Sequence, residues 1–230
     1  MKRFDATKRP RRLGTTLICI CSLAFAACTI DQAPTPTVPP AIPNPLRCNV
    51  EVYCILGLAN VFSLGLNDLA SKLRNQGVPA AVVSGSDVDA LANEIVDARI
   101  QSGDTRPLVL TGHSYGADDC LRIADRMKSR GLSVDLVVLI DPSSPIPVPS
   151  NIDKCINFYI PTAFGNVLPG VFAGNPIVVA PGNTNTILIN QQVTADLGPE
   201  LGAIDHFSLD SSGTIHQLIL LEVFKLCPQN

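Results

Sequence analysis

The sequence predicts an α/β protein built as a three-layer sandwich, with a mostly parallel central sheet covered by helices on both faces. Two observations support this class: the alternation of strand-like and helix-like segments, and the length and hydrophobic content of the chain. Short apolar runs alternate with segments whose apolar residues recur at helical spacing, and a β-α-β order of this kind is typical of parallel sheets. The chain has 230 residues, 46% of them hydrophobic, which is enough for one domain with a sizeable core.

The first part of the predicted domain contains four strands and three helices in alternation. In the first helix, Leu66, Leu69, Ala70 and Leu73 share one face, and Gly77 follows as an end signal. The expected strands are 50–56, 80–83, 108–110 and 134–140, and the expected helices are 66–76, 87–100 and 115–130.

The second part is less regular. Proline-rich segments at 142–149 and 161–176 predict loops, and a final apolar helix is expected at 212–226. A strand is expected at 156–160. Two further strand candidates, 177–179 and 186–189, compete for the place of the last strand.

The segment 112–116, Gly-His-Ser-Tyr-Gly, lies between an apolar strand and an amphipathic helix. A G-x-S-x-G sequence in that setting is typical of a sharp turn that presents its serine above the sheet edge. The helix that follows offers unpaired N–H groups and the positive end of its dipole to a developing oxyanion. We therefore predict that Ser114 is a nucleophile. Asp118 and Asp119 lie in the first turn of that helix, where we expect a structural role.

Together with the sheet pattern, this segment resembles the α/β-hydrolase superfamily, particularly its small, cap-less lipase, cutinase and thioesterase-like members. The resemblance covers roughly residues 48–227 and implies a triad in the chain order serine, acid, histidine. Asp141 ends the apolar run 135–141 and is the expected acid. His206 lies in the loop before the last helix and is the expected histidine. Asp205 and Asp210, which flank it, are the alternative acids.

The other two histidines are not expected to act on the serine. His113 lies inside the turn and is predicted to be a packing residue, and His216 lies inside the final helix. Two backbone N–H groups should form the oxyanion hole: that of Tyr115 and that of Leu58, with Ala59 as the alternative to Leu58. Gly57 would let this backbone approach closely.

These residues predict acyl transfer through a covalent intermediate on Ser114, with no metal and no cofactor. The expected activity is that of a serine esterase or thioesterase with a small acyl-ester or thioester substrate. The apolar segments 142–149 and 158–172 are candidate pocket walls, through side chains such as Ile146, Val148, Phe164, Leu168 and Phe172. The alternatives are a catalytically silent protein of this fold that binds an envelope lipid or partner, and acyl transfer to another acceptor.

Residues 1–28 are predicted to be a bacterial export signal, because a basic region precedes the short apolar stretch 13–27. The segment Phe25-Ala26-Ala27-Cys28 resembles a lipoprotein signal, in which Cys28 carries the lipid. The alternative is ordinary cleavage after Ala24-Phe25-Ala26, which would release a soluble protein. Residues 29–46 are rich in proline and predict an extended tether. The hydrolase domain would then be 47–230, located in the periplasm or cell envelope.

The charge balance argues against nucleic acid as a partner. Six of the 17 Lys and Arg residues and one of the 20 Asp and Glu residues lie in 1–28, so the remaining chain has a net charge near −8.

Five cysteines follow Cys28, and an exported protein should pair some of them. Cys54 and Cys120 lie on apolar elements and fit a core. Cys155 with Cys227, or Cys48 with Cys227, are the candidate bridges. No C-x-x-C spacing suggests a zinc or redox site.

Overall fold

The computed structural model describes residues 48–57, 63–85, 88–161 and 174–228. The predicted signal 1–28 with Cys28, the tether 29–46 and Leu58 lie outside the described residues. Within the described part of the chain, no helix is long and apolar enough to cross a membrane.

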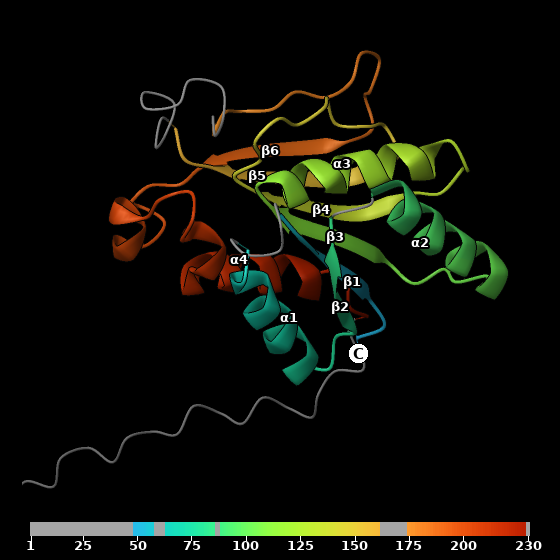
Figure 1. Ribbon diagram of the computed structural model, residues 1–230, viewed down its shortest axis with the longest axis horizontal. Coiled ribbons are helices and arrows are strands. Elements are labelled where there is room, and N and C mark those ends of the chain that lie inside the picture. Colours follow the sequence, from blue (N-terminus) through green and yellow to red (C-terminus); the bar gives the residue numbers. More distant parts are fainter. Residues whose placement is uncertain (1–47, 58–62, 86–87, 162–173, 229–230) are drawn as a thin grey trace, which may run out of the picture. The chain divides into compact units, whose positions relative to one another are not determined.

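A six-stranded, entirely parallel sheet forms the centre of the domain (Figure 1). Its strand order is β2-β1-β3-β4-β5-β6. The chain therefore adds β2 on one side of β1, crosses over, and adds β3 to β6 in sequence on the other side. The carboxyl ends of β1 and β3 therefore flank a topological switch point, which is where open parallel sheets bind ligands. The strands are β1 (Glu51–Leu56), β2 (Ala80–Ser84), β3 (Leu108–His113), β4 (Val134–Ile140), β5 (Ile152–Tyr159) and β6 (Ile187–Gln192).

Helices cover both faces of the sheet, as the sequence predicts. Helices α1 (Gly65–Asn75) and α4 (Gly213–Phe224) share one hydrophobic core with the sheet, and α2 (Val88–Ser102) and α3 (Tyr115–Lys128) share the other. Each face of the sheet forms its own core because successive side chains of a strand point to opposite faces. In strand β4, Leu136 and Val138 enter the first core, and Val137 and Leu139 enter the second. The two pairs of helices lie on opposite sides of the sheet in Figure 1.

The second half of the domain departs from the prediction in two places. Strand β5 begins at Ile152 rather than at 156, and its polar Asp153 and Lys154 explain why the apolar pattern does not mark its start. Lys154 is satisfied by an ion pair with Glu222 of α4 at 2.7 Å. The last strand is β6, while Val179 forms only an isolated bridge with Val148.

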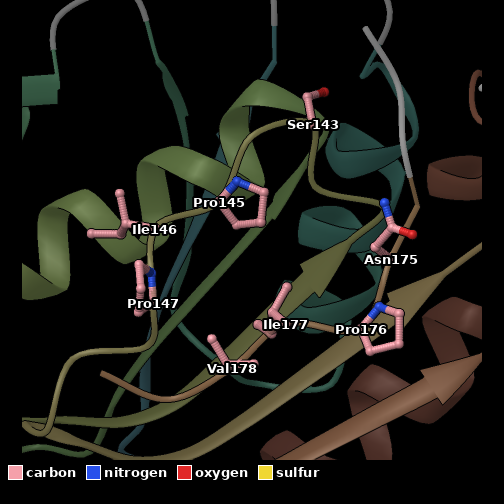
Figure 2. A pocket seen from close by; sticks show the side chains of 8 residues that line it. All are labelled: Ser143, Pro145, Ile146, Pro147, Asn175, Pro176, Ile177 and Val178. Carbon is pink, nitrogen blue, oxygen red and sulfur yellow. The ribbon is translucent and has the colours of Figure 1, made fainter. Parts of the chain in front are cut away.

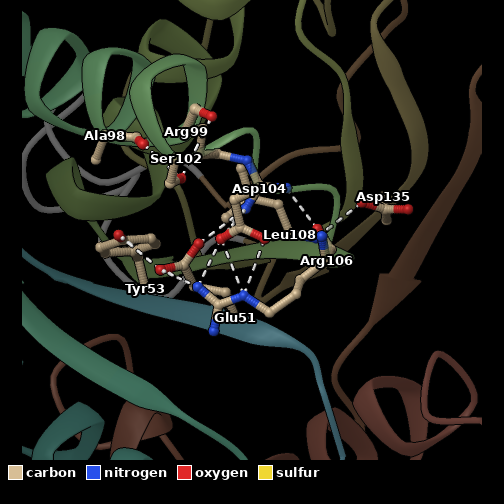
Figure 3. A network of polar contacts seen from close by, with 9 residues as sticks. All are labelled: Glu51, Tyr53, Ala98, Arg99, Ser102, Asp104, Arg106, Leu108 and Asp135. Atoms are coloured by element: carbon tan, nitrogen blue, oxygen red, sulfur yellow. Dashed lines mark hydrogen bonds and ion pairs between the residues drawn. The ribbon is translucent and has the colours of Figure 1, made fainter.

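A polar network closes the edge of the sheet opposite the carboxyl ends of the strands (Figure 3). Arg99 of α2 is only 8% exposed and donates to Glu51 of β1 at 2.8 Å. Arg106 pairs with Asp104 at 2.6 Å and also reaches Glu51 at 3.3 Å. These contacts anchor the loop that enters β3, and they lie away from the predicted site.

One disulfide joins Cys48, just before β1, to Cys227, just after α4. The structure thus forms one of the two bridges that the sequence left open. The other described cysteines, Cys54, Cys120 and Cys155, are free thiols buried in the core.

Replacing both Cys48 and Cys227 by alanine should lower the free energy of unfolding by about 2–5 kcal/mol, because the bridge closes a loop of nearly the whole domain. Urea unfolding with and without reductant measures this. Reductant should destabilise the wild-type protein by a similar amount and leave the double variant unchanged. A wild-type protein insensitive to complete reduction would contradict the prediction.

Candidate active site

Ser114 occupies the sharp turn between β3 and α3. Its φ of 57° and ψ of −125° lie outside the regions that side chains favour. Both motif glycines are sterically required. A Cβ on Gly112 would lie 2.2 Å from the carbonyl oxygen of Gly116, and a Cβ on Gly116 would lie 2.2 Å from that of Ile55. The turn therefore needs glycine on each side of the serine.

The three predicted triad residues form a continuous chain of hydrogen bonds. The Oγ of Ser114 lies 3.0 Å from Nε2 of His206, and Nδ1 of His206 lies 2.7 Å from Oδ2 of Asp141. All three are buried, with exposed fractions of 6%, 2% and 2%. With the Nδ1 proton donated to the carboxylate, Nε2 is left to accept the proton of Ser114. The arrangement can therefore remove a proton from the serine hydroxyl.

Asp141 follows directly after β4 and is held from two sides. Its backbone has a φ of 46° and its N–H donates to the carbonyl of Phe158 at 2.7 Å. Its second carboxylate oxygen, Oδ1, accepts from the N–H of Ile160 at 3.0 Å. These bonds to β5 and the residue after it orient Oδ2 toward His206.

The two alternative acids are engaged elsewhere. Asp210 accepts from the backbone N–H of Gly65 at 2.8 Å, and burial raises its pKa to about 6. Asp205 accepts from the backbone N–H and the hydroxyl of Ser208, which lowers its pKa. Asp205 thereby stabilises the turn that carries His206.

His113 does more than the packing role predicted for it. Its ring is buried, and it lies 2.7 Å from the carbonyl oxygen of His206 through Nε2 and 3.0 Å from the hydroxyl of Ser63 through Nδ1. The Ser63 oxygen also accepts from the N–H of Gly57 at 3.1 Å. His113 thus ties the end of β3 to the backbone of the histidine loop. His216 is buried in α4 and faces Asp210 and Lys72 instead, and burial lowers its pKa.

Of the two expected oxyanion donors, Tyr115 is the first residue of α3. Its N–H has no acceptor within the helix's own ladder, because the first turn of a helix lacks such partners. Leu58 and Ala59 lie outside the described residues. Gly57, which precedes them, does reach the turn, since a Cβ there would lie 2.8 Å from the carbonyl of His113 and 3.5 Å from the Cβ of Ser114.

Sequence reasoning missed Ser143, whose Oγ lies 3.0 Å from the Oγ of Ser114. Ser143 is two residues beyond Asp141, in the loop predicted only as a pocket wall. The register of β3 against β4 pairs His113 with Ile140, so the residues that follow these two strands meet at the same edge. A hydroxyl two residues after the predicted acid was the available signal.

A pocket of about 240 Å³ opens beside Ser143 (Figure 2). One wall comes from the predicted loop after Asp141, and the opposite wall comes from the segment before β6. All lining residues are uncharged and most are apolar; they are Ser143, Pro145, Ile146, Pro147, Asn175, Pro176, Ile177 and Val178.

The predicted pocket walls are therefore correct only in part. Val148 is fully buried in the core shared with α2 and α3, because the chain turns inward there to form its bridge with Val179. Phe158 packs into the opposite core. Phe164, Leu168 and Phe172 lie outside the described residues.

Asp118 of α3 lies beneath the same loop. It is fully buried, its Oδ2 accepts from the N–H of Ser144 at 2.9 Å, and its Oδ1 has no hydrogen-bond partner. Burial raises its pKa from 3.8 to about 7. This carboxyl group is structural, as predicted, but it supports the loop as well as the first turn of the helix.

The free energy of unfolding should therefore fall as pH rises from about 4 to 7. In that window the native Asp118 keeps a proton that the unfolded chain has released, so higher pH favours unfolding. Asp118→Asn removes this titration and should be more stable than wild type above pH 7 by about 1–3 kcal/mol. Urea unfolding at several pH values measures both slopes. Identical slopes would contradict the prediction.

Across the described residues, no group of three or more His, Cys, Asp or Glu side chains is placed to hold a metal ion.

Comparisons with solved structures find proteins that this chain resembles over most of its length. The solved structures similar to this chain include RedJ, a thioesterase from the prodiginine biosynthetic pathway of Streptomyces coelicolor, at 14% identity and a TM-score of 0.46, covering 84% of this chain and 91% of that one. They also include a cutinase-like protein from Cryptococcus sp., at 12% identity and a TM-score of 0.39, covering 77% and 92%. No curated protein matches the sequence.

A family model described as a thioesterase domain matches residues 64–150. The matched segment runs from the start of α1 to the loop after β4, so it includes Ser114 and Asp141, while His206 lies beyond it. The chain therefore has a six-stranded parallel sheet covered by helices on both faces, and its segment 64–150 matches the thioesterase domain.

Proposed function

We propose that this protein is a serine hydrolase that cleaves a small acyl thioester or ester through an acyl-enzyme on Ser114. The observation that carries the proposal is the buried hydrogen-bond chain from Ser114 through His206 to Asp141. Such a chain activates a hydroxyl that is otherwise a weak nucleophile. The thioesterase match over residues 64–150 supports an acyl thioester as substrate.

The geometry supports a two-step reaction. Ser114 Oγ attacks the substrate carbonyl carbon as its proton passes to Nε2 of His206, and Asp141 stabilises the imidazolium that forms. His206 then returns the proton to the departing thiol or alcohol. In the second step a water molecule gives a proton to His206 as it attacks the acyl-enzyme. His206 then returns that proton to Ser114 Oγ as the bond to the acyl group breaks, which releases the acid.

The N–H of Tyr115 is the proposed first donor to the oxyanion, since it follows the nucleophile at the start of α3. The N–H of Leu58 remains the proposed second donor. Gly57 brings the backbone that leads to Leu58 against the turn.

The pocket beside Ser143 favours a short, uncharged acyl group. Its lining carries no charge and its volume of about 240 Å³ lies below the roughly 300–1,000 Å³ of sites that hold drug-sized ligands. Each additional buried methylene adds about 0.8 kcal/mol only while space remains, so longer chains should gain nothing.

Hydrolysis of a series of p-nitrophenyl esters and matched N-acetylcysteamine thioesters, from two to twelve acyl carbons, tests the proposal. The wild-type protein should prefer the shorter chains, and Ser114→Ala should be inactive on all of them. A well-folded wild-type protein with no activity on any member would favour the silent binding role instead.

We also propose that the protein is exported and anchored to the cell envelope through lipidated Cys28. The basic and apolar pattern of 1–28 and the proline-rich 29–46 support this, and the Cys48–Cys227 disulfide suits an oxidising compartment. Mass spectrometry of the mature protein should find a lipid-modified Cys28 as its first residue, and Cys28→Ala should leave the membrane fraction. A mature protein that begins after Ala26 would support soluble secretion.

A further inference from the structure

Two buried hydroxyl groups meet at the proposed nucleophile. The Oγ of Ser143 lies 3.0 Å from the Oγ of Ser114, and the two residues are only 9% and 6% exposed. A serine oxygen has one proton to donate and two lone pairs that can accept. Because the Ser114 proton is directed at Nε2 of His206, the hydrogen bond between the hydroxyls must use the proton of Ser143. Ser143 is therefore the donor.

The position of Ser143 is fixed by the helix that carries the nucleophile. The carboxyl group of Asp118 accepts from the N–H of Ser144, the residue after Ser143, at 2.9 Å. The N–H of Asp118 in turn donates to the carbonyl of Ser114 at 3.2 Å. The buried Asp118 of α3 thus holds the turn of Ser143 at a set distance from the turn of Ser114. On the other side of Ser143, Asp141 is held by the N–H of Ile160.

The same hydroxyl also borders the pocket. Ser143 is one of its lining residues, and in Figure 2 it lies at one end of the pocket. An acyl group in this pocket would therefore have its carbonyl end near Ser143 and Ser114.

We propose that Ser143 is a positioning residue that sets the direction of attack by Ser114. This inference rests on the proposed function. With one proton given to His206 and one lone pair occupied by Ser143, Ser114 keeps a single lone pair for the substrate carbonyl. When the bond from Ser114 Oγ to the carbonyl carbon forms, the Ser114 proton moves to His206. Ser143 retains its own proton throughout.

A positioning role predicts a loss in turnover rather than in binding. Removing one neutral hydrogen bond should lower kcat by about 3- to 10-fold. KM should stay within about 2-fold, because the bond orients the attacking oxygen and does not hold the ground-state substrate.

The variants Ser143→Thr and Ser143→Val test this, because their side chains have nearly the same shape and only threonine retains the hydroxyl. The readouts are kcat and KM for a short acyl ester and the second-order rate constant for labelling by a fluorophosphonate. That rate constant is not changed by a fraction of permanently inactive protein in the preparation. Ser144→Ala is the matched control, since its side chain is exposed and its N–H remains available to Asp118.

We expect Ser143→Thr to label and turn over at least 3-fold faster than Ser143→Val, with equal KM, and Ser144→Ala to match wild type. Equal rate constants for Ser143→Thr and Ser143→Val, or a difference confined to KM, would overturn the positioning role. Labelling of the wild-type protein in the same experiment would leave the proposed function intact. A well-folded wild-type protein that does not label would overturn both.

Discussion

Asp141→Asn should lower kcat for acyl-ester hydrolysis by about 10⁴-fold, with little change in the free energy of unfolding. The carboxylate accepts the Nδ1 proton of His206 at 2.7 Å and so fixes the tautomer in which Nε2 can act as a base. An asparagine amide can instead donate to Nδ1, which leaves the proton on Nε2, facing Ser114. A loss of about 10⁴-fold is typical when that tautomer is reversed. Steady-state kinetics and urea unfolding of the same preparation measure both quantities.

Asp205→Asn and Asp210→Asn are the matched controls, because both lie close in sequence to His206 and were alternative acids. Their carboxylates are bound to Ser208 and to Gly65, and an asparagine oxygen can still accept those hydrogen bonds. Both should keep kcat within a few-fold of wild type. If either control loses activity by orders of magnitude while Asp141→Asn does not, the acid has been misplaced.

Substitution of Ser114 should separate activity from stability. Ser114→Ala and Ser114→Gly should each lower hydrolysis by at least about 10⁴-fold, because both remove the attacking oxygen. Their stabilities should differ. The backbone at Ser114 has a φ of 57° and a ψ of −125°, which glycine adopts without strain and alanine does not.

Ser114→Gly is therefore expected to be about 1 kcal/mol more stable than Ser114→Ala, as measured by urea unfolding. The pair also controls for folding, because an equal loss of activity in two variants of different stability does not come from unfolding. Residual activity near the wild-type level in either variant would exclude Ser114 as the nucleophile.

The first half of the fold could be predicted because the apolar pattern of each element matches the way in which that element is buried. Strands such as β4 are buried on both faces and therefore read as continuous apolar runs, and α1 carries its buried residues at strict helical spacing. The start of β5 could not be predicted, because Asp153 and Lys154 lie at its exposed end and interrupt the apolar pattern. Residues 177–179 are as apolar as a strand, yet they form only one bridge with Val148.

The candidate site shows the same division. Ser114, Asp141 and His206 could be proposed from motif, strand end and loop order, and the structure brings their side chains together. Ser143 and the bonds of His113 could not, because they depend on which loop ends meet above the sheet. The choice of Cys48 over Cys155 as the partner of Cys227 likewise requires knowing that Cys155 lies inside the sheet, on β5.

Labelling of the purified protein with a fluorophosphonate, followed by peptide mapping, tests the central claim most directly. Only an activated serine displaces the fluoride at a useful rate, so the label reports the nucleophile without knowledge of the substrate. We predict modification at Ser114 alone in the wild-type protein, and none in His206→Ala. Labelling that persists unchanged in His206→Ala, or that maps to another serine, or a well-folded protein that does not label, would contradict the account.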